Sequence, residues 1–260
     1  MSSPILFNNG AAYEQYMGVW SQSVGNAFID WLDLKPGLRW LDVGCGNGAF
    51  TETVVQRCAP AGIAGIDPAA GQLSFARSRP ALARARFEQG DAMSLPFADQ
   101  GFDVAIMPLV VVFVPEPARA VAEMARVVAP GGVVCAYMWD FEGGGFPYDV
   151  LQSELRALGL TVPMPPSPWA AELDAMHKLW SDAGLHEIAE HQITVPRTYQ
   201  SFDEYRQIIL GGPSVSGLLS ELTPAQRTLL DERLQARLPA DAAGRITYSS
   251  RANAIRGRVQ

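Results

Sequence analysis

The sequence predicts an α/β fold built on a doubly wound, mostly parallel sheet with helices on both faces. Between residues 38 and 139, short apolar runs typical of buried strands alternate with helix-compatible runs. A glycine-rich loop at residues 44–48 joins the first strand to the first helix, and Asp67 ends the second strand. In such a sheet, ligands bind outside the carboxyl ends of the strands. We therefore expect the functional site there.

Composition limits the class of protein. The 260 residues, 48% hydrophobic and 18% charged, fit one large domain or a domain with a sizeable insertion. A net charge of −7 argues against nucleic-acid or anionic-membrane partners, which need clustered positive charge. The start resembles no signal peptide, and the apolar run 104–114 is too short to span a membrane. The three cysteines form no CxxC pair, so we expect a cytoplasmic protein with reduced thiols and no metal site.

Residues 8–33 carry aromatic side chains at helical spacing, which predicts one or two helices. These are Tyr13, Tyr16, Trp20, Phe28 and Trp31. The pattern allows two interpretations. The aromatic side chains pack in the core, or residues 13–20 form a flap over a cofactor.

The central part of the chain alternates regularly. We expect strands at residues 38–43, 62–66, 84–88, 102–107 and 133–139. We expect helices at residues 49–58, 69–78 and 116–128, the last ended by Pro130-Gly131-Gly132.

After residue 140 the pattern changes. Helices are expected near residues 149–158 and 171–183, with strands at 186–195 and 245–258. Capping-box spacing at Ser201 and at Thr223 starts a helix at each, so residues 200–244 could form a helical cap above the strand ends. The predicted division is a helical flap at 1–37, a cofactor-binding core at 38–140, and a cap plus the last two strands at 141–260.

The glycine loop and Asp67 together indicate a nucleoside cofactor. Glycine lets the backbone approach a ligand closely, and a carboxylate about 20 residues later suits a ribose hydroxyl pair. Gly44-x-Gly46-x-x-Ala49 also satisfies the dinucleotide fingerprint, so an NAD-dependent dehydrogenase is an alternative. Against it, neither lysine has a tyrosine four residues before it, and Asp42 would repel a pyrophosphate.

A set of motifs in order carries a family resemblance. They are Leu41-Asp42-Val43-Gly44-Cys45-Gly46-Asn47-Gly48, Gly65-Ile66-Asp67-Pro68, Gly90-Asp91-Ala92, Phe102-Asp103-Val104, Val114-Pro115-Glu116-Pro117 and Arg126-Val127-Val128-Ala129-Pro130-Gly131-Gly132. Together they resemble the class I S-adenosylmethionine-dependent methyltransferases, in the small-molecule, ubiquinone-biosynthesis-like branch. The resemblance covers roughly residues 38–139. It implies a Rossmann-like sheet of seven strands, with a helical cap inserted before the last strand.

The resemblance also implies S-adenosyl-L-methionine as the cofactor and a role for each site residue. The backbone of residues 44–48 would hold the methionine part with Asp42 facing its amino group, and Asp67 would take the ribose hydroxyls. Asp91 and its two successors would bracket the adenine, and Met107 with Pro108 would lie near the methyl group. The expected cofactor-binding set is Tyr16, Asp42, Gly44, Cys45, Gly46, Asn47, Gly48, Asp67, Pro68, Gln72, Asp91, Ala92, Met93, Met107 and Pro108.

No catalytic residue can be assigned from the sequence. Methyl transfer by in-line displacement depends chiefly on positioning and on excluding water. Residues 108–113 contain no side-chain base and suggest an apolar wall. His177, His186 and His191 are weak candidates for a base. Five aromatic side chains could line a pocket for a small, apolar or aromatic acceptor: Trp139, Phe141, Phe146, Trp169 and Trp180. A catalytically silent S-adenosylmethionine-binding protein is the second alternative; the methylated atom and the oligomeric state stay open.

Overall fold

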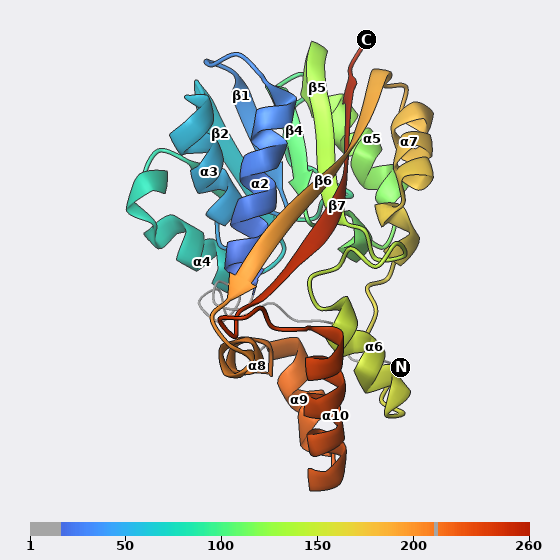
Figure 1. The fold of residues 1–260 in the computed structure, drawn as a ribbon. Coiled ribbons are helices and arrows are strands. Elements are labelled where there is room, and N and C mark those ends of the chain that lie inside the picture. The colour runs from blue at the N-terminus through green and yellow to red at the C-terminus, as the bar shows by residue number, and fades with distance from the viewer. Residues whose placement is uncertain (1–16, 211–212) are drawn as a thin grey trace.

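The computed structural model describes residues 17–210 and 213–260. Within them, seven strands form one sheet in the order β3-β2-β1-β4-β5-β7-β6 (Figure 1). The strands are β1 Arg39–Val43, β2 Gly62–Asp67, β3 Arg86–Gln89, β4 Phe102–Pro108, β5 Val128–Trp139, β6 His186–Tyr199 and β7 Ile246–Arg258. All neighbours are parallel except the two antiparallel pairs that β7 makes with β5 and β6. The predicted fold class is confirmed.

Helices cover both faces of this sheet (Figure 1). The main ones are α2 Val19–Leu32, α3 Ala49–Cys58, α4 Ala70–Ser78, α5 Pro117–Val127 and α7 Leu173–Asp182. The helix α6 Asp149–Ala157 instead lies below the sheet in this view. α2 and α3 pack together on one face, and α5 and α7 pack together on the other. The central strands β1, β4 and β5 are therefore buried on both sides, which explains their nearly continuous apolar runs.

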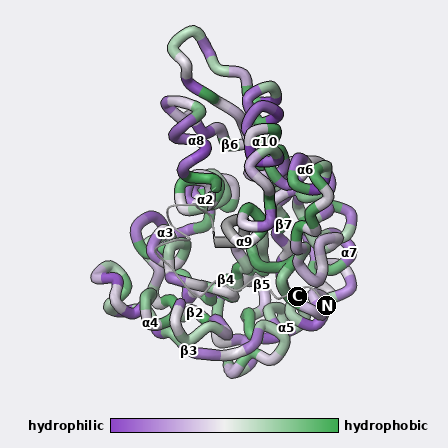
Figure 2. Tube along the Cα trace, turned by 90° about the horizontal axis from the view of Figure 1, so that it is seen from below, coloured by the Kyte–Doolittle hydropathy of each residue, from purple (hydrophilic) through white to green (hydrophobic). Residues whose placement is uncertain are grey.

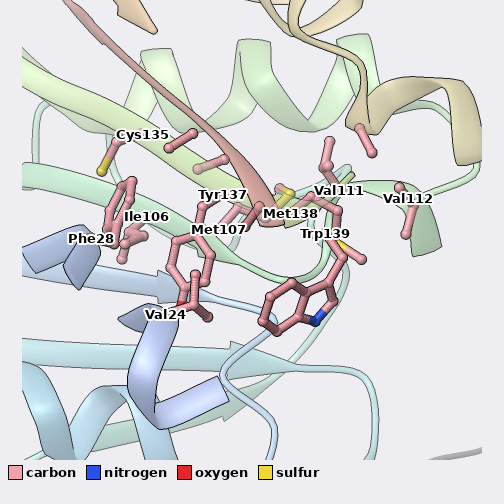
Figure 3. Packing of buried hydrophobic residues seen from close by; sticks show 14 of the residues in the cluster. Val24, Phe28, Ile106, Met107, Val111, Val112, Cys135, Tyr137, Met138 and Trp139 are labelled. Carbon is pink, nitrogen blue, oxygen red and sulfur yellow. The ribbon is translucent and has the colours of Figure 1, made fainter. Parts of the chain in front are cut away.

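α2 packs on the sheet through an apolar stripe. Trp20, Val24 and Phe28, spaced four residues apart, are fully buried. Figure 3 shows Val24 and Phe28 facing Tyr137 of β5, and the rings of Phe28 and Tyr137 are 4.6 Å apart. The core-packing interpretation therefore holds for Trp20 and Phe28. Tyr13 and Tyr16 lie outside the described residues, and the boundaries of the flap and the other units stay a prediction.

The segment Pro130-Gly131-Gly132 corrects one prediction. It was expected to separate a helix from a strand, but β5 already begins at Val128, directly after α5. The segment lies inside the strand, where the β4–β5 register shifts between Phe102 and Val104. A Cβ at Gly132 would lie 2.6 Å from the carbonyl oxygen of Asp103. The glycine is thus required by close backbone packing at an irregular strand pairing.

The chain between β6 and β7 forms the predicted helical insertion, with three helices instead of two. They are α8 Phe202–Leu210, α9 Pro213–Glu221 and α10 Pro224–Arg237, and they lie beyond the carboxyl edge of the sheet (Figure 1). The full capping box at Thr223 is present. At Ser201 only half of it forms: the Ser201 hydroxyl accepts from the N–H of Glu204, but the Glu204 carboxylate accepts from the N–H of Gln200 and not from that of Ser201.

α10 is amphipathic, with hydrophilic and hydrophobic residues alternating along it (Figure 2). Leu230 and Leu234 are buried, and the helix packs against α6. β6 is also longer than expected, since it continues to Tyr199 as a ribbon with β7 beyond the end of β5.

The irregular pairing at Gly132 predicts a stability change. Gly132→Ala should destabilise the fold by about 1–3 kcal/mol, because the new methyl group meets a backbone oxygen that cannot move freely. Gly62→Ala is the matched control, since a Cβ there meets nothing within 4 Å. Urea unfolding of both variants measures the difference, and equal stabilities would contradict the packing requirement.

Candidate cofactor site

A cavity of about 1000 Å³ lies at the carboxyl ends of β1, β2, β4 and β5. Its walls come from loops that are far apart in the sequence. They are the glycine loop 44–47, the end of β2 at 67–69, the turn 91–93, the segment 108–110 after β4, and the start of α2. Most predicted cofactor residues therefore meet around one cavity.

The glycines of the loop differ in what a side chain would meet at each position. A Cβ at Gly44 would lie 2.5 Å from the side chain of Val110, and one at Gly48 would lie 2.8 Å from Leu82. Both have positive φ, 75° and 79°. A Cβ at Gly46 (φ 51°) meets no protein atom within 4 Å. Gly46 lines the cavity, so its open side is available to a ligand.

The carboxylate of Asp67 joins the loop to the second strand. Its Oδ2 accepts a hydrogen bond from the backbone N–H of Gly46 at 2.9 Å, and its Oδ1 accepts one from Ala69 at 2.8 Å. Partial burial raises the pKa of Asp67, and the two hydrogen bonds oppose that shift. A carboxylate offers about four acceptor positions, so lone pairs remain for a hydroxyl pair in the cavity.

Arg79 fixes the loop from the side opposite Asp67. Its Nε donates to the carbonyl oxygen of Asn47 at 2.7 Å, and its Nη1 forms an ion pair with Glu52 at 2.8 Å. The Asn47 side chain in turn accepts from the N–H of Ala49 at the start of α3. Sequence reasoning missed Arg79, because it follows α4 and lies 32 residues from the loop.

The turn after β3 forms the far side of the cavity. Asp91 accepts a hydrogen bond from the N–H of Met93 at 2.8 Å, which fixes the turn. Ala92 and Met93 line the cavity, as do Pro68 and Gln72 on the β2 side. These predicted residues are thus brought together.

Three predicted residues support the cavity wall without lining it. Asp42 is fully buried, and its Oδ2 accepts a hydrogen bond from Thr51 at 2.6 Å. Met107 is also fully buried, and Gly48 faces Leu82. Tyr16, which also belongs to the predicted set, lies outside the described residues. Asp42 therefore does not face the cavity as the resemblance implied.

The sequence indicated only part of the apolar wall. Leu109, Val110 and Phe113 line the cavity, in agreement with the apolar wall expected at residues 108–113, whereas Phe50 and Tyr137 also line it and were missed. Leu109 has a φ of 58°, which is unusual for this residue type and is held by its N–H bond to the carbonyl of Tyr137. Tyr137 pairs with Pro108 at the end of β4. No sequence pattern distinguishes Phe50 and Tyr137 from core residues, because only strand pairing decides which residues reach the cavity.

The aromatic residues and histidines considered as acceptor or base candidates lie outside the cavity wall. None of the aromatic residues expected to form an acceptor pocket lines the cavity; these are Trp139, Phe141, Phe146, Trp169 and Trp180. Trp180 is buried and donates to the carbonyl of Val134, whereas Trp169 is 46% exposed. None of the three histidines lines the cavity either. In the described part of the chain, no group of His, Cys, Asp and Glu side chains could hold a metal ion, and no helix has the length and apolarity for crossing a membrane.

The sheet order and the site define a class of protein. Residues 41–136 match the family described as the methyltransferase domain. This match confirms the predicted resemblance to the class I S-adenosylmethionine-dependent methyltransferases.

Known relatives agree with this assignment. A segment is 34% identical over 119 residues to the 2-methyl-6-phytyl-1,4-hydroquinone methyltransferase 2 of Oryza sativa subsp. japonica, covering 45% of this chain and 34% of that protein. Another is 33% identical over 129 residues to a demethylmenaquinone methyltransferase of Staphylococcus aureus, covering 49% and 52%. The chain thus spans about a third to a half of these relatives.

A solved structure supports the fold. Phosphoethanolamine N-methyltransferase 2 of Haemonchus contortus, in complex with S-adenosyl-L-methionine, superposes with a TM-score of 0.58 at 17% identity. The match covers 96% of this chain and 56% of that one.

The site generates a pH prediction at Asp42. Burial raises the pKa of its carboxyl from 3.8 to about 7, although the hydrogen bond from Thr51 opposes the shift. Between these values the folded state holds a proton that the unfolded state has lost. The contribution of Asp42 to the free energy of unfolding should therefore be greatest below pH 3.8. It should fall as the pH rises to about 7, by up to about 1.4 kcal/mol per pH unit.

Asp42→Asn should remove this contribution, because the amide does not titrate and its oxygen still accepts from Thr51. Unfolding free energies of both proteins, measured by urea titration from pH 4 to pH 8, give the comparison. The difference between them should change over this range and level off above about pH 7. Parallel stability curves would show that Asp42 is ionised in the folded protein.

Proposed function

We propose that this chain transfers a methyl group from S-adenosyl-L-methionine to a small, apolar or aromatic acceptor. The observation that carries the proposal is the meeting of Gly46, Asp67 and the turn 91–93 at one cavity. The two methyltransferase relatives act, by their names, on quinone-type compounds, which supports an acceptor of this chemical class.

The residues at the cavity fit the cofactor. Gly46 leaves open space beside the backbone of the loop, and Asp67 keeps acceptor positions for the ribose hydroxyls. Asp91, Ala92 and Met93 would bracket the adenine, and the start of α3 would favour an anionic end of the ligand. When bound, the cofactor supplies an electrophilic methyl group on a positively charged sulfur.

On the acceptor side, the chain supplies positioning. The wall made by Val110, Phe113 and Tyr137 is apolar and would exclude water from the reaction. The carboxylates at the cavity are already engaged, Glu52 with Arg79, and Asp67 and Asp91 with backbone N–H groups. We therefore keep the proximity mechanism and assign no general base.

The start of α2 and the segment after β4 would select the acceptor, because both line the cavity. Among the described residues that line the cavity, none comes from 141–182 or 200–244. A role of the helical insertion in the choice of acceptor would therefore require a ligand that extends beyond this cavity.

Two measurements test the proposal. Calorimetry with S-adenosylmethionine, its demethylated product and NAD should show binding of the first two and not of NAD, which separates the dehydrogenase alternative. Transfer of a labelled methyl group to a panel of phenols, hydroquinones and amines should then show turnover. Binding without transfer to any of the panel would favour the silent cofactor-binding protein.

The glycine loop gives the first functional prediction. Gly46→Val should weaken cofactor binding at least about tenfold, because the branched side chain would occupy the open space at the cavity. Gly37→Val is the matched control, with positive φ (83°), no atom within 4 Å of its Cβ position and no place in the cavity wall. Calorimetry measures the affinities, and equal losses in both variants would assign the effect to backbone strain.

Asp67 gives the second. Asp67→Asn should weaken S-adenosylmethionine binding by about 1.5–3 kcal/mol, the range for hydrogen bonds to a charged group. Asp103→Asn is the control, since that carboxylate pairs with Arg39 outside the cavity. The two variants are compared by titration with the cofactor. Unchanged affinity in Asp67→Asn would remove the ribose assignment.

A further inference from the structure

A group of aromatic side chains surrounds Trp20 at the carboxyl edge of the sheet. Its ring lies 6.4 Å from the ring of Trp139 and 5.3 Å from that of Tyr248. The guanidinium carbon of Arg197 lies 5.9 Å from the Trp20 ring and 4.6 Å from the ring of Tyr199. The positive charge of Arg197 is thus held between aromatic rings.

Strand register places this group on one face of the sheet. Trp139 of β5 is paired with Ala252 of β7, and Tyr248, four residues earlier on β7, is paired with Arg197 of β6. Ser250 lies between them on β7. Since side chains two residues apart share a face, Trp139, Ser250 and Arg197 all point toward Trp20 of α2.

Besides the Nε1 of Trp20 itself, three buried polar atoms around Trp20 have no hydrogen-bond partner. They are Nη1 of Arg197, Nε1 of Trp139 and Oγ of Ser250. All three can donate a hydrogen bond, and two of them can only donate. Among the described residues, no carboxylate forms an ion pair with Arg197. Unsatisfied buried donors are costly, and such a set fits an anionic oxygen ligand.

The neighbouring groups cannot supply that negative charge. Burial raises the pKa of both Tyr199 and Tyr248, so their hydroxyls stay neutral. The Tyr248 hydroxyl donates to the carbonyl of Pro147. Glu204 acts electrostatically on Tyr199, but its carboxylate accepts a hydrogen bond from the N–H of Gln200.

The group adjoins the cofactor cavity. Trp139 lies two residues beyond Tyr137 on the same face of β5, a distance of roughly 6.6 Å along the strand. Figure 3 shows Tyr137 and Trp139 on the side of Val24. Val19 and Ser21, the neighbours of Trp20 on α2, line the cavity. The cavity therefore reaches the two residues that flank Trp20 in the sequence.

We propose that Arg197, with Trp139 and Ser250, binds a carboxylate on the methyl acceptor, which is thus an aromatic carboxylic acid. This inference rests on the proposed methyl transfer and narrows its acceptor class. The ring of the acceptor lies in the cavity beside Val19 and Ser21 of α2, and its carboxylate accepts hydrogen bonds from Arg197, Trp139 and Ser250. Arg197 then acts in acceptor specificity and takes no part in the transfer step.

The test is calorimetric titration of the full chain with 2-naphthoate and with 2-naphthamide, which match in shape and differ in charge. Wild type should bind the naphthoate at least tenfold more tightly, the change expected for a hydrogen bond to a charged group. Arg197→Gln should abolish this preference. Arg258→Gln is the control and should retain the preference, because Arg258 pairs with Glu187 at the opposite end of β7.

Equal affinities for the two probes in wild type, or no binding of either, would overturn the inference. So would a preference that survives in Arg197→Gln. If Arg197→Gln does not fold, Ser250→Ala takes its place and should weaken naphthoate binding at least threefold. A separate titration with S-adenosylmethionine keeps the two proposals apart. If the protein binds S-adenosylmethionine but shows no preference for the naphthoate, only this inference is contradicted. If it prefers the naphthoate but does not bind S-adenosylmethionine, only the proposed methyl transfer is contradicted.

Discussion

The structure of the site depends on the bonds between Asp67 and two backbone N–H groups. One oxygen accepts from Gly46 and the other from Ala69. These bonds hold the glycine loop after β1 against the start of α4, so two adjacent strand ends form one surface. Because the same carboxylate retains free acceptor positions at the cavity, the residue that shapes the loop can also bind the ligand.

Support for the loop continues on its buried side. Asp42 lies beneath it with Thr51, and Arg79 holds the carbonyl of Asn47 from outside. Gly44 and Gly48 are each required by a close neighbour, Val110 and Leu82 respectively. The loop is therefore fixed before a ligand arrives, which lowers the entropy cost of binding.

α2 connects the core, the cavity and the aromatic group around Trp20. Phe28 packs on Tyr137 in the core, and Ser21 lines the cavity. Trp20 contacts Trp139, Tyr248 and Arg197. A helix that packs on the sheet along one side can thus present different residues to the core, to the cavity and to the aromatic group.

The sequence alone determined the order of strands and helices, because hydrophobic periodicity and capping residues act locally. α3 has the predicted bounds, and the capping box at Thr223 starts α10. It also brought out Asp67 and the turn 91–93, since short motifs carry their own geometry. Tertiary structure decided that Asp42 is buried and that Tyr137 reaches the cavity, because burial depends on which strands pair. Arg79 and Arg197 gained their surroundings the same way, from partners distant in the chain.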